Sequence, residues 1–520
     1  MNIYRNGIKD ILNVTFHGLF GITWLMLLLG IVFVHIVSDK QVAVPFVLAA
    51  IVLVFHGYIV GGIKWIKRCF VCCTDKYSIV VIVIFIIAIQ AVIQIYVGYE
   101  MAVTPAGDRG IIFKQASQMA VNGTFKMSRE YNFYFLRYPN NMLLVILEAA
   151  WFMLLKAVRI RDFLYGNMAL NIFAIDLAII LCTILVYRKY GKNTAVIFQL
   201  MTFLFIPFYT YIPFVYTDTL VLPLVAGILL CCQMLEEWQK EKGVKYYLIL
   251  CAVGFLTWFG YGLKPTVAII SIAYFLYMLV TKDWKRGILN TLLIMSVFGA
   301  CLLTFNIVVD KAEIVDQTNY DEENFPYEHW IMMGLKGRGN YCHKDRLYTS
   351  SFKTKSEKQK GDIKMIKERL KGYGMLGLLI HQYNKAVFTW SNGKYDMEFH
   401  LQRQPRRYSW LRSLFFKKGS LYPLYDKYCT IYHFVVLFLI MCSIVYGFLR
   451  HETDSAVMWK MALFGLFLFL SIWETKSRYV MQFVPVMLLV AVDMLVKLKK
   501  LLMDKIYLLK LNRKCWKLWV

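Results

Sequence analysis

Apolar stretches of about twenty residues recur along this chain and are separated by short polar segments. The stretch 78–98 shows the pattern well: it is dense in Ile and Val and carries no charge before Glu100. A helix of this length crosses about 30 Å of hydrocarbon, and it satisfies its own backbone hydrogen bonds there. The pattern therefore predicts an all-α, polytopic membrane protein. The predicted crossings are 17–37, 43–62, 78–98, 165–187, 195–213, 218–236, 246–263, 265–281, 288–309, 430–449, 458–473 and 477–496.

Composition and charge placement support this class and orient the chain. Hydrophobic residues make up 59% and charged residues 18% of 520. The net charge of +26 is concentrated in short loops beside the predicted helices, at 64–76, 188–192, 240–245, 282–286 and 497–505. Basic loops of this kind mark the cytoplasmic face and can hold anionic lipid. We therefore expect a multi-pass protein of the cell membrane with both termini inside, and no nucleic-acid partner.

One apolar stretch conflicts with this orientation. Residues 140–157 are hydrophobic enough for a crossing, but a crossing there would move the basic loop 188–192 to the outside. We therefore interpret this stretch as a re-entrant or interfacial helix on the outer face. The total is then about twelve crossings.

The predicted helices divide the chain into five parts. Region 310–428 is polar, mixed in charge and rich in aromatic residues, which is typical of a folded loop or small outer domain rather than a disordered linker. The expected parts are 1–77 with two amino-terminal helices, 78–309 with a first outer loop at 100–164, 310–428, 429–496 with the last helices, and 497–520 as a basic cytoplasmic tail.

Three carboxylates from distant parts of the chain are predicted to reach the outer face. Asp108 follows the crossing 78–98, Asp218 begins another crossing, and Glu474 lies between the last two. Ionisable groups near the ends of membrane helices are functional candidates, because burying them is costly. The alternative is that each one only caps a helix or extends to water.

Cations are expected at the same face. Lys264 lies in a turn before Pro265, and Arg137 and Arg478 are also predicted outside. An Arg fork fits phosphate oxygens, and Lys supplies a compact positive charge. Acids beside cations would suit a substrate that is part lipid phosphate and part hydroxyl. Local pairing of Glu474 with Lys476 or Arg478 is the competing interpretation.

Four short motifs resemble the GT-C glycosyltransferases, particularly bacterial members related to protein O-mannosyltransferases and the lipid A aminoarabinose transferase. The resemblance spans roughly residues 78 to 490, and the two amino-terminal helices are extra to it. The first acid also stands alone, without the Asp-Glu pair of many protein mannosyltransferases. The motifs are Asp108 with Arg137-Tyr138-Pro139-Asn140-Asn141, Tyr216-Thr217-Asp218-Thr219-Leu220, Gly262-Leu263-Lys264-Pro265-Thr266 and Glu474-Thr475-Lys476-Ser477-Arg478-Tyr479.

The resemblance implies a GT-C-like bundle that transfers a sugar, with inversion, from a polyprenyl-phosphate donor to an outer glycan, lipid or protein acceptor. Asp108 would be the general base, and Asp218 and Glu474 would orient the acceptor or the cations. A divalent metal bridging Asp108 and Asp218 is compatible with the oligosaccharyltransferase branch, but no metal ligand is assigned. The substrate-binding residues implied are Arg137, Tyr138, Asn140, Lys264, Arg478 and Tyr479.

A transporter or flippase for lipid-linked precursors is the alternative from another class. Transporters usually place polar residues near the bilayer midplane, often in two related halves. Here the predicted mid-helix positions are almost free of charge, with Asp176 an exception, and no similarity between halves is visible. A structural assembly partner would leave the acids gathered at one face unexplained. The sequence therefore favours an enzyme acting at the membrane surface.

Overall fold

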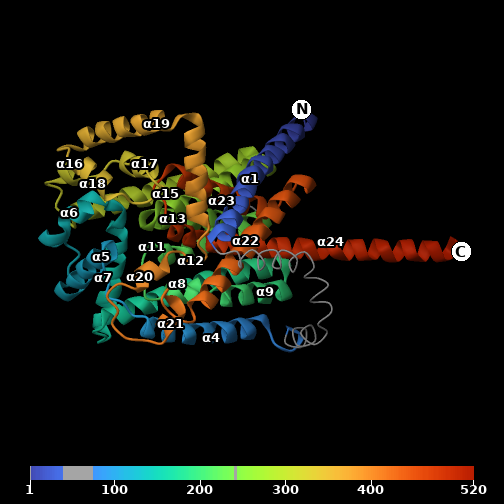
Figure 1. Ribbon diagram of the computed structural model, residues 1–520, viewed down its shortest axis with the longest axis horizontal. Helices are drawn as coiled ribbons and strands as arrows, with labels where there is room; N and C mark the ends of the chain where they lie inside the picture. The colour runs from blue at the N-terminus through green and yellow to red at the C-terminus, as the bar shows by residue number, and fades with distance from the viewer. Residues whose placement is uncertain (1, 39–73, 239–242, 520) are drawn as a thin grey trace.

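The computed structural model of the protein describes residues 2–38, 74–238 and 243–519, which are largely helical (Figure 1). Among these residues no β-strand forms, although an isolated bridge joins Val103 to Pro405. The all-α prediction is confirmed for this part of the chain. The longer bundle helices are α1 (Asn2–Ser38), α4 (Ile79–Glu100), α8 (Phe163–Tyr190), α9 (Lys192–Phe203), α12 (Leu222–Glu237), α13 (Val244–Leu263), α14 (Ala268–Thr281), α15 (Trp284–Lys311), α22 (Tyr422–Arg450), α23 (Ser455–Ile472) and α24 (Val484–Trp519).

Within the described residues, 10 helices are long and apolar enough to cross a membrane, and one of them is Pro139–Ala157, the stretch interpreted from sequence as re-entrant or interfacial. The sequence predicted about twelve crossings without that stretch. Segment 195–213 is divided between α9 and α10 (Pro207–Thr210), because proline lacks an N–H and disfavours helical geometry in the residue before it. Segment 265–281 forms a shorter apolar helix. The crossing predicted at 43–62 lies outside the described residues.

Short helices, together with the 36-residue helix α19 (Lys355–Trp390), gather around one end of the bundle. They are α5 (Asp108–Asn122), α6 (Arg129–Arg137), η2 (Pro139–Asn141), α7 (Met142–Ala157), α11 (Thr217–Leu220), η3 (Pro265–Val267), α16 (Tyr320–Glu323), α17 (Glu328–Gly334), α18 (His343–Ser350), α19 (Lys355–Trp390), α20 (Met397–Leu401), α21 (Leu411–Phe415) and η4 (Ser477–Phe483).

The two chain termini lie toward the other end of the bundle (Figure 1). We call that end the terminal end and the end with the short helices the distal end. Basic residues meet at the terminal end: Lys9 of α1 donates to the Lys282 carbonyl, and Lys189 near the end of α8 lies 3.5 Å from Asp454. The basic segments 188–192 and 282–286 therefore lie at the end that also holds the termini.

The bundle helices differ in how far they are buried. Of the most apolar window in Ser477–Met503, 83% is buried, whereas the corresponding windows of α4 and α15 are only 11% buried. Ile84 and Phe85 of α4 and Leu289 and Leu292 of α15 are exposed. Such outward-facing apolar side chains fit a lipid environment, because contact with hydrocarbon removes their apolar surface from water.

Both ends of α7 lie at the distal end, where Figure 1 shows it beside α5. At its start, Tyr216 donates a hydrogen bond to Asn141 Oδ1 at 3.3 Å. Near its end, Lys156 donates to the carbonyl of Val121 in α5 at 2.8 Å. The next helix, α8, begins against the end of α4, where the rings of Tyr99 and Tyr165 are 5.8 Å apart.

Region 310–428 packs its helices on the distal end. Asn324 donates to the Leu136 carbonyl at 2.9 Å, and the Ile314 carbonyl accepts from the Met127 N–H at 2.7 Å. Within this region α19 is interrupted at Gly374, whose φ of 60° is left-handed and strongly favours glycine. These contacts tie the region to α6 and to the segment that precedes it.

Candidate functional site

Asp218, Lys264 and Arg478 come together at the distal end and form a buried ion-pair group. Arg478 Nη1 lies 2.7 Å from Asp218 Oδ2, and Lys264 Nζ donates to Oδ1 of the same carboxylate. The Asp218 side chain is fully buried. One carboxylate is therefore held by two cations, and hydrogen bonds between charged groups of this kind are among the strong ones.

Lys264 reaches Asp218 because α13 ends at this residue. The following Pro265 disfavours helical geometry in the residue before it, and Lys264 accordingly has extended φ and ψ angles of −156° and 109°. Close packing of α13 on α7 depends on Gly262, where an added Cβ would lie 2.6 Å from Leu143. The Gly262–Pro265 turn thus has a structural role as well as carrying the lysine.

Glu474 lies in the connection between α23 and η4 and is only 5% exposed. Its N–H donates to the Trp330 carbonyl at 3.1 Å, its carboxylate is 4.0 Å from Lys476 Nζ, and Tyr479 lies 3.5 Å away through its hydroxyl. Burial raises the pKa of the Glu474 carboxyl, the nearby cations lower it, and Asp108 raises it, with a net increase. Glu474 is therefore next to the ion-pair group but separate from it.

Asp108 is the first residue of α5 and is exposed, whereas Asp218 and Glu474 are buried. Its negative charge contributes to the raised pKa of Glu474. Burial raises the pKa of the Tyr134 hydroxyl well above its ordinary value, and Tyr216 and Asp108 raise it further. The first predicted acid therefore lies near the third, Glu474, on the accessible side of the cluster.

The polar network includes residues that sequence reasoning did not select. Asn141 is buried and donates to the Tyr134 hydroxyl at 2.8 Å, and Tyr216 donates to Asn141 at 3.3 Å. Arg109 donates to the Pro213 carbonyl at 2.6 Å, which ties the start of α5 to the segment before Tyr216. Tyr216 and Asn141 belong to the quoted motifs, and that was the only signal for them in the sequence.

The other predicted substrate-binding residues have different surroundings. Arg137 pairs with Glu323 of α16. Burial, with a smaller contribution from Asp108, raises the pKa of Tyr138 to about 12. Asn140 is exposed and lies 3.4 Å from Asn141 through its amide. The Lys264 ammonium lies over the face of the Tyr479 ring, 5.0 Å from its centroid.

Region 310–428 also contributes to the site. The Thr475 N–H donates to the Gly339 carbonyl at 2.7 Å. The Asn392 side-chain amide donates a hydrogen bond to Asp396 Oδ1 at 2.9 Å. The backbone N–H of Arg478 also donates to the Asp396 carboxylate. The segment that carries Glu474 and Arg478 is therefore braced by the same region whose role the sequence left open.

Glu474→Gln should reduce the pH dependence of stability. Because burial raises the pKa of Glu474, the folded state binds this proton more tightly than the unfolded state, and stability falls as pH rises from the ordinary carboxyl value through the raised one. We expect the thermal midpoint of the variant, relative to the unmodified protein, to increase as pH rises above the ordinary carboxyl pKa of about 4. Glu368→Gln, at an exposed position of α19, is the control. Equal pH slopes for Glu474→Gln and the unmodified protein would contradict this assignment.

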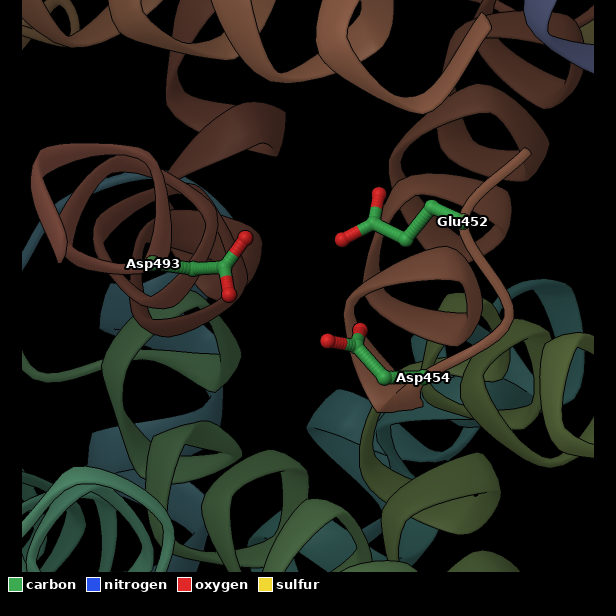
Figure 2. A group of neighbouring side chains, drawn as sticks. All are labelled: Glu452, Asp454 and Asp493. Carbon is green, nitrogen blue, oxygen red and sulfur yellow. The ribbon is translucent and has the colours of Figure 1, made fainter. Parts of the chain in front are cut away.

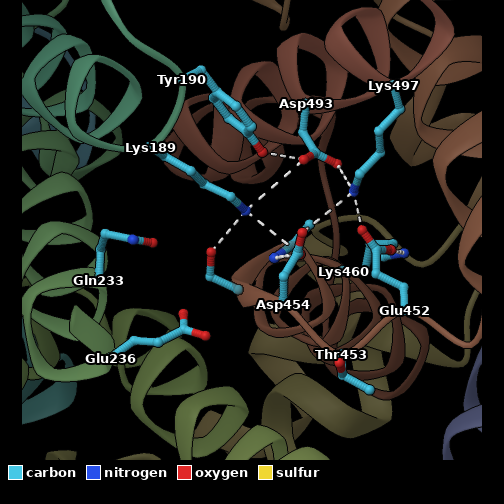
Figure 3. Close-up of polar contacts among 12 residues, drawn as sticks. Lys189, Tyr190, Gln233, Glu236, Glu452, Thr453, Asp454, Lys460, Asp493 and Lys497 are labelled. Atoms are coloured by element: carbon cyan, nitrogen blue, oxygen red, sulfur yellow. Dashed lines mark hydrogen bonds and ion pairs between the residues drawn. The ribbon is translucent and has the colours of Figure 1, made fainter. Parts of the chain in front are cut away.

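A second charged cluster lies at the terminal end. Glu452, Asp454 and Asp493 face one another, with ligand oxygens within 4.8 Å (Figure 2). Lys497 Nζ lies among them, 2.6 Å from Asp493 and 3.8 Å from Asp454, and it also bonds Glu452 (Figure 3). Lys460 pairs with Glu452.

A third lysine, Lys189, lies 3.5 Å from Asp454. Three lysines (Lys189, Lys460 and Lys497) therefore balance the three carboxylates of this cluster. The position among the carboxylates that a cation would take is held by the Lys497 ammonium. In the part of the chain that the structure describes, this is the one group of His, Cys, Asp or Glu with metal-ligand spacing. At the distal end both Asp218 oxygens are bound by cations, which favours an ion-pair role for Asp218 over metal ligation.

Comparison with known proteins gives one match. A protein family described as conserved hypothetical integral membrane protein matches residues 4–497, most of the chain. No curated protein and no solved structure matches it.

Proposed function

The chain belongs to the family of conserved hypothetical integral membrane proteins, and from the distal-end cluster we propose that it is a glycosyltransferase using a polyprenyl-phosphate-linked sugar. The observation that carries the proposal is that an accessible carboxylate, Asp108, and the buried ion pair of Asp218 with Arg478 both act on Tyr216: burial raises the pKa of its hydroxyl, and the charges of Asp108 and Asp218 raise it further. Such a group combines a proton acceptor with positive charge for a phosphate. Both are needed to move a sugar from a lipid phosphate to a hydroxyl.

In the proposed reaction, the acceptor hydroxyl oxygen attacks the anomeric carbon while its proton passes to the Asp108 carboxylate. The bond from the anomeric carbon to the phosphate oxygen breaks, its electron pair stays on the phosphate, and the sugar inverts. Lys264 and Arg478, which face Asp218, would stabilise the negative charge that develops on the leaving phosphate. Glu474 and Tyr479 would orient the acceptor or these cations.

We assign the distal end to the extracytoplasmic side. The basic segments beside Lys9, Lys189 and Lys282 meet at the terminal end, and basic segments of this kind favour the cytoplasm. The donor lipid would approach between helices whose exposed surfaces are apolar, such as α15. The acceptor would be a glycan, lipid or protein outside the membrane.

The direct test uses the purified protein in lipid vesicles that contain a polyprenyl-phosphate sugar. We expect free polyprenyl phosphate to be released only when a hydroxyl acceptor is present, and a membrane-impermeant acceptor to be used on the distal side. Movement of the donor lipid between leaflets without acceptor, and with no sugar transferred, would support the transporter alternative and overturn the proposal.

A further inference from the structure

The two halves of α19 expose different chemistry, and the change occurs at Gly374. Before this residue the exposed side chains are mainly charged: Lys364, Lys367, Glu368 and Lys371. After it they are mainly apolar, with Asn384 as a polar exception. The exposed fractions are 83% for Met375, 71% for Leu376, 63% for Leu379, 53% for Ile380 and 41% for Tyr383.

These five residues form one helical face. Their spacing of one, four, five and eight residues from Met375 follows the helical repeat. A contiguous apolar surface of this kind is unusual where a protein faces water. Figure 1 shows the half of α19 after the break running across the direction of α24, as a helix lying along a membrane surface would run.

The opposite face of this half-helix holds the segment that leads to Glu474. His381 and Lys385 both bond the Gly334 carbonyl, at 3.0 and 2.9 Å, and Lys385 also bonds the Ser471 carbonyl at 2.9 Å. Thr389 lies 2.9 Å from Thr475 through their hydroxyls. The apolar face is therefore coupled through one helix to the candidate site.

The apolar face continues onto a bundle helix. Gly30 of α1 allows close contact, because an added Cβ would lie 2.5 Å from Val387 and 2.6 Å from the Tyr383 hydroxyl. On α1, Met26 and Leu29 are exposed, within an apolar helix long enough to cross a membrane. The exposed face of α19 is thus beside a surface that lipid would already cover.

We propose that residues 375–384 form an interfacial helix whose apolar face is immersed in the lipid leaflet at the distal end. Lys364, Lys367 and Lys371 lie on the other side of the break, where they suit the head-group and water region. Lipid contact would then set the depth of the half-helix, and its bonds to Gly334, Ser471 and Thr475 would set the position of Glu474 relative to the membrane.

The test measures which quencher reaches each half of α19. A fluorescent amino acid is introduced by stop-codon suppression at Leu379 or Met375, and at Lys367 as the control, in the full chain held in lipid nanodiscs. Lipids with a nitroxide near the head group should remove most of the emission at 379 and 375, whereas iodide should quench mainly at 367.

Two outcomes would overturn the proposal. Strong quenching by iodide at both 379 and 375 would mean that the face is exposed to water. Protection of both positions from lipid nitroxide and from iodide would mean that protein covers the face, either a second copy or another partner. Two positions on the same face are labelled because a disturbance caused by one label would affect that position alone, whereas a property of the face would appear at both.

Discussion

Asp108→Asn should slow sugar transfer by roughly 10² to 10⁴-fold, the usual contribution of a general base. The amide keeps the size of the side chain but cannot take the acceptor proton. Asp108 is exposed at the start of α5, and substitutions of exposed side chains usually change stability little, so the fold should persist. Donor binding should change little, because the two cations on Asp218 remain. The measurement is acceptor-dependent release of polyprenyl phosphate at saturating donor.

Glu313→Gln is a suitable control for Asp108→Asn. Glu313 is an exposed acid that follows α15 and pairs with Lys126 at the surface, so its replacement should leave transfer unchanged. Comparable thermal midpoints for both variants would separate loss of chemistry from loss of fold. Full activity of a folded Asp108→Asn variant would remove Asp108 as the base.

Lys497→Met should destabilise the protein by about 3–5 kcal/mol, the usual cost of removing one partner from a buried ion pair. Lys497 bonds Glu452 and Asp493, whose side chains are 4% and 0% exposed. Without the ammonium, the cluster would retain three carboxylates and two lysines, so one buried negative charge would lack compensation. The measurement is thermal unfolding in a fixed detergent.

Two further variants make the Lys497 result specific. Lys499→Met changes an exposed lysine on the same helix and should be nearly neutral. Adding Asp493→Asn to Lys497→Met restores the charge balance and should recover part of the lost stability, which a double-mutant cycle measures. A Lys497→Met variant as stable as Lys499→Met would show that the carboxylates find compensation elsewhere.

The pairing of Arg478 shows what sequence reasoning could and could not reach. Its motif brought attention to Arg478, with local pairing of Glu474 with Lys476 or Arg478 as the alternative. In the fold Arg478 pairs with Asp218, 260 positions away in the chain, while Glu474 approaches Lys476. Chain proximity could not decide this, because the extended backbone at Lys476 and the start of η4 determine where each side chain points.

The turn before α7 gives a second example at the scale of one residue. The sequence nominated Asn140, but Asn141 is the buried residue that bonds Tyr134 and is bonded by Tyr216. Neighbouring side chains on a tight 3₁₀ turn point in different directions, so the motif could locate the turn without identifying its buried amide. Asp396 had no sequence signal, because its contact with Arg478 depends on the packing of region 310–428.

The sequence by itself determined that this is an all-α integral membrane protein and which helix ends carry ionisable residues. Helix length, apolar content and basic clusters are local properties, and lipid requires that backbone groups be satisfied within each segment. Only the tertiary structure decided that Asp108, Asp218, Lys264 and Arg478 share one end, that three lysines balance Glu452, Asp454 and Asp493, and that α19 turns an apolar face outward. These arrangements join residues far apart in the chain, so they depend on how the helices pack and where each one ends.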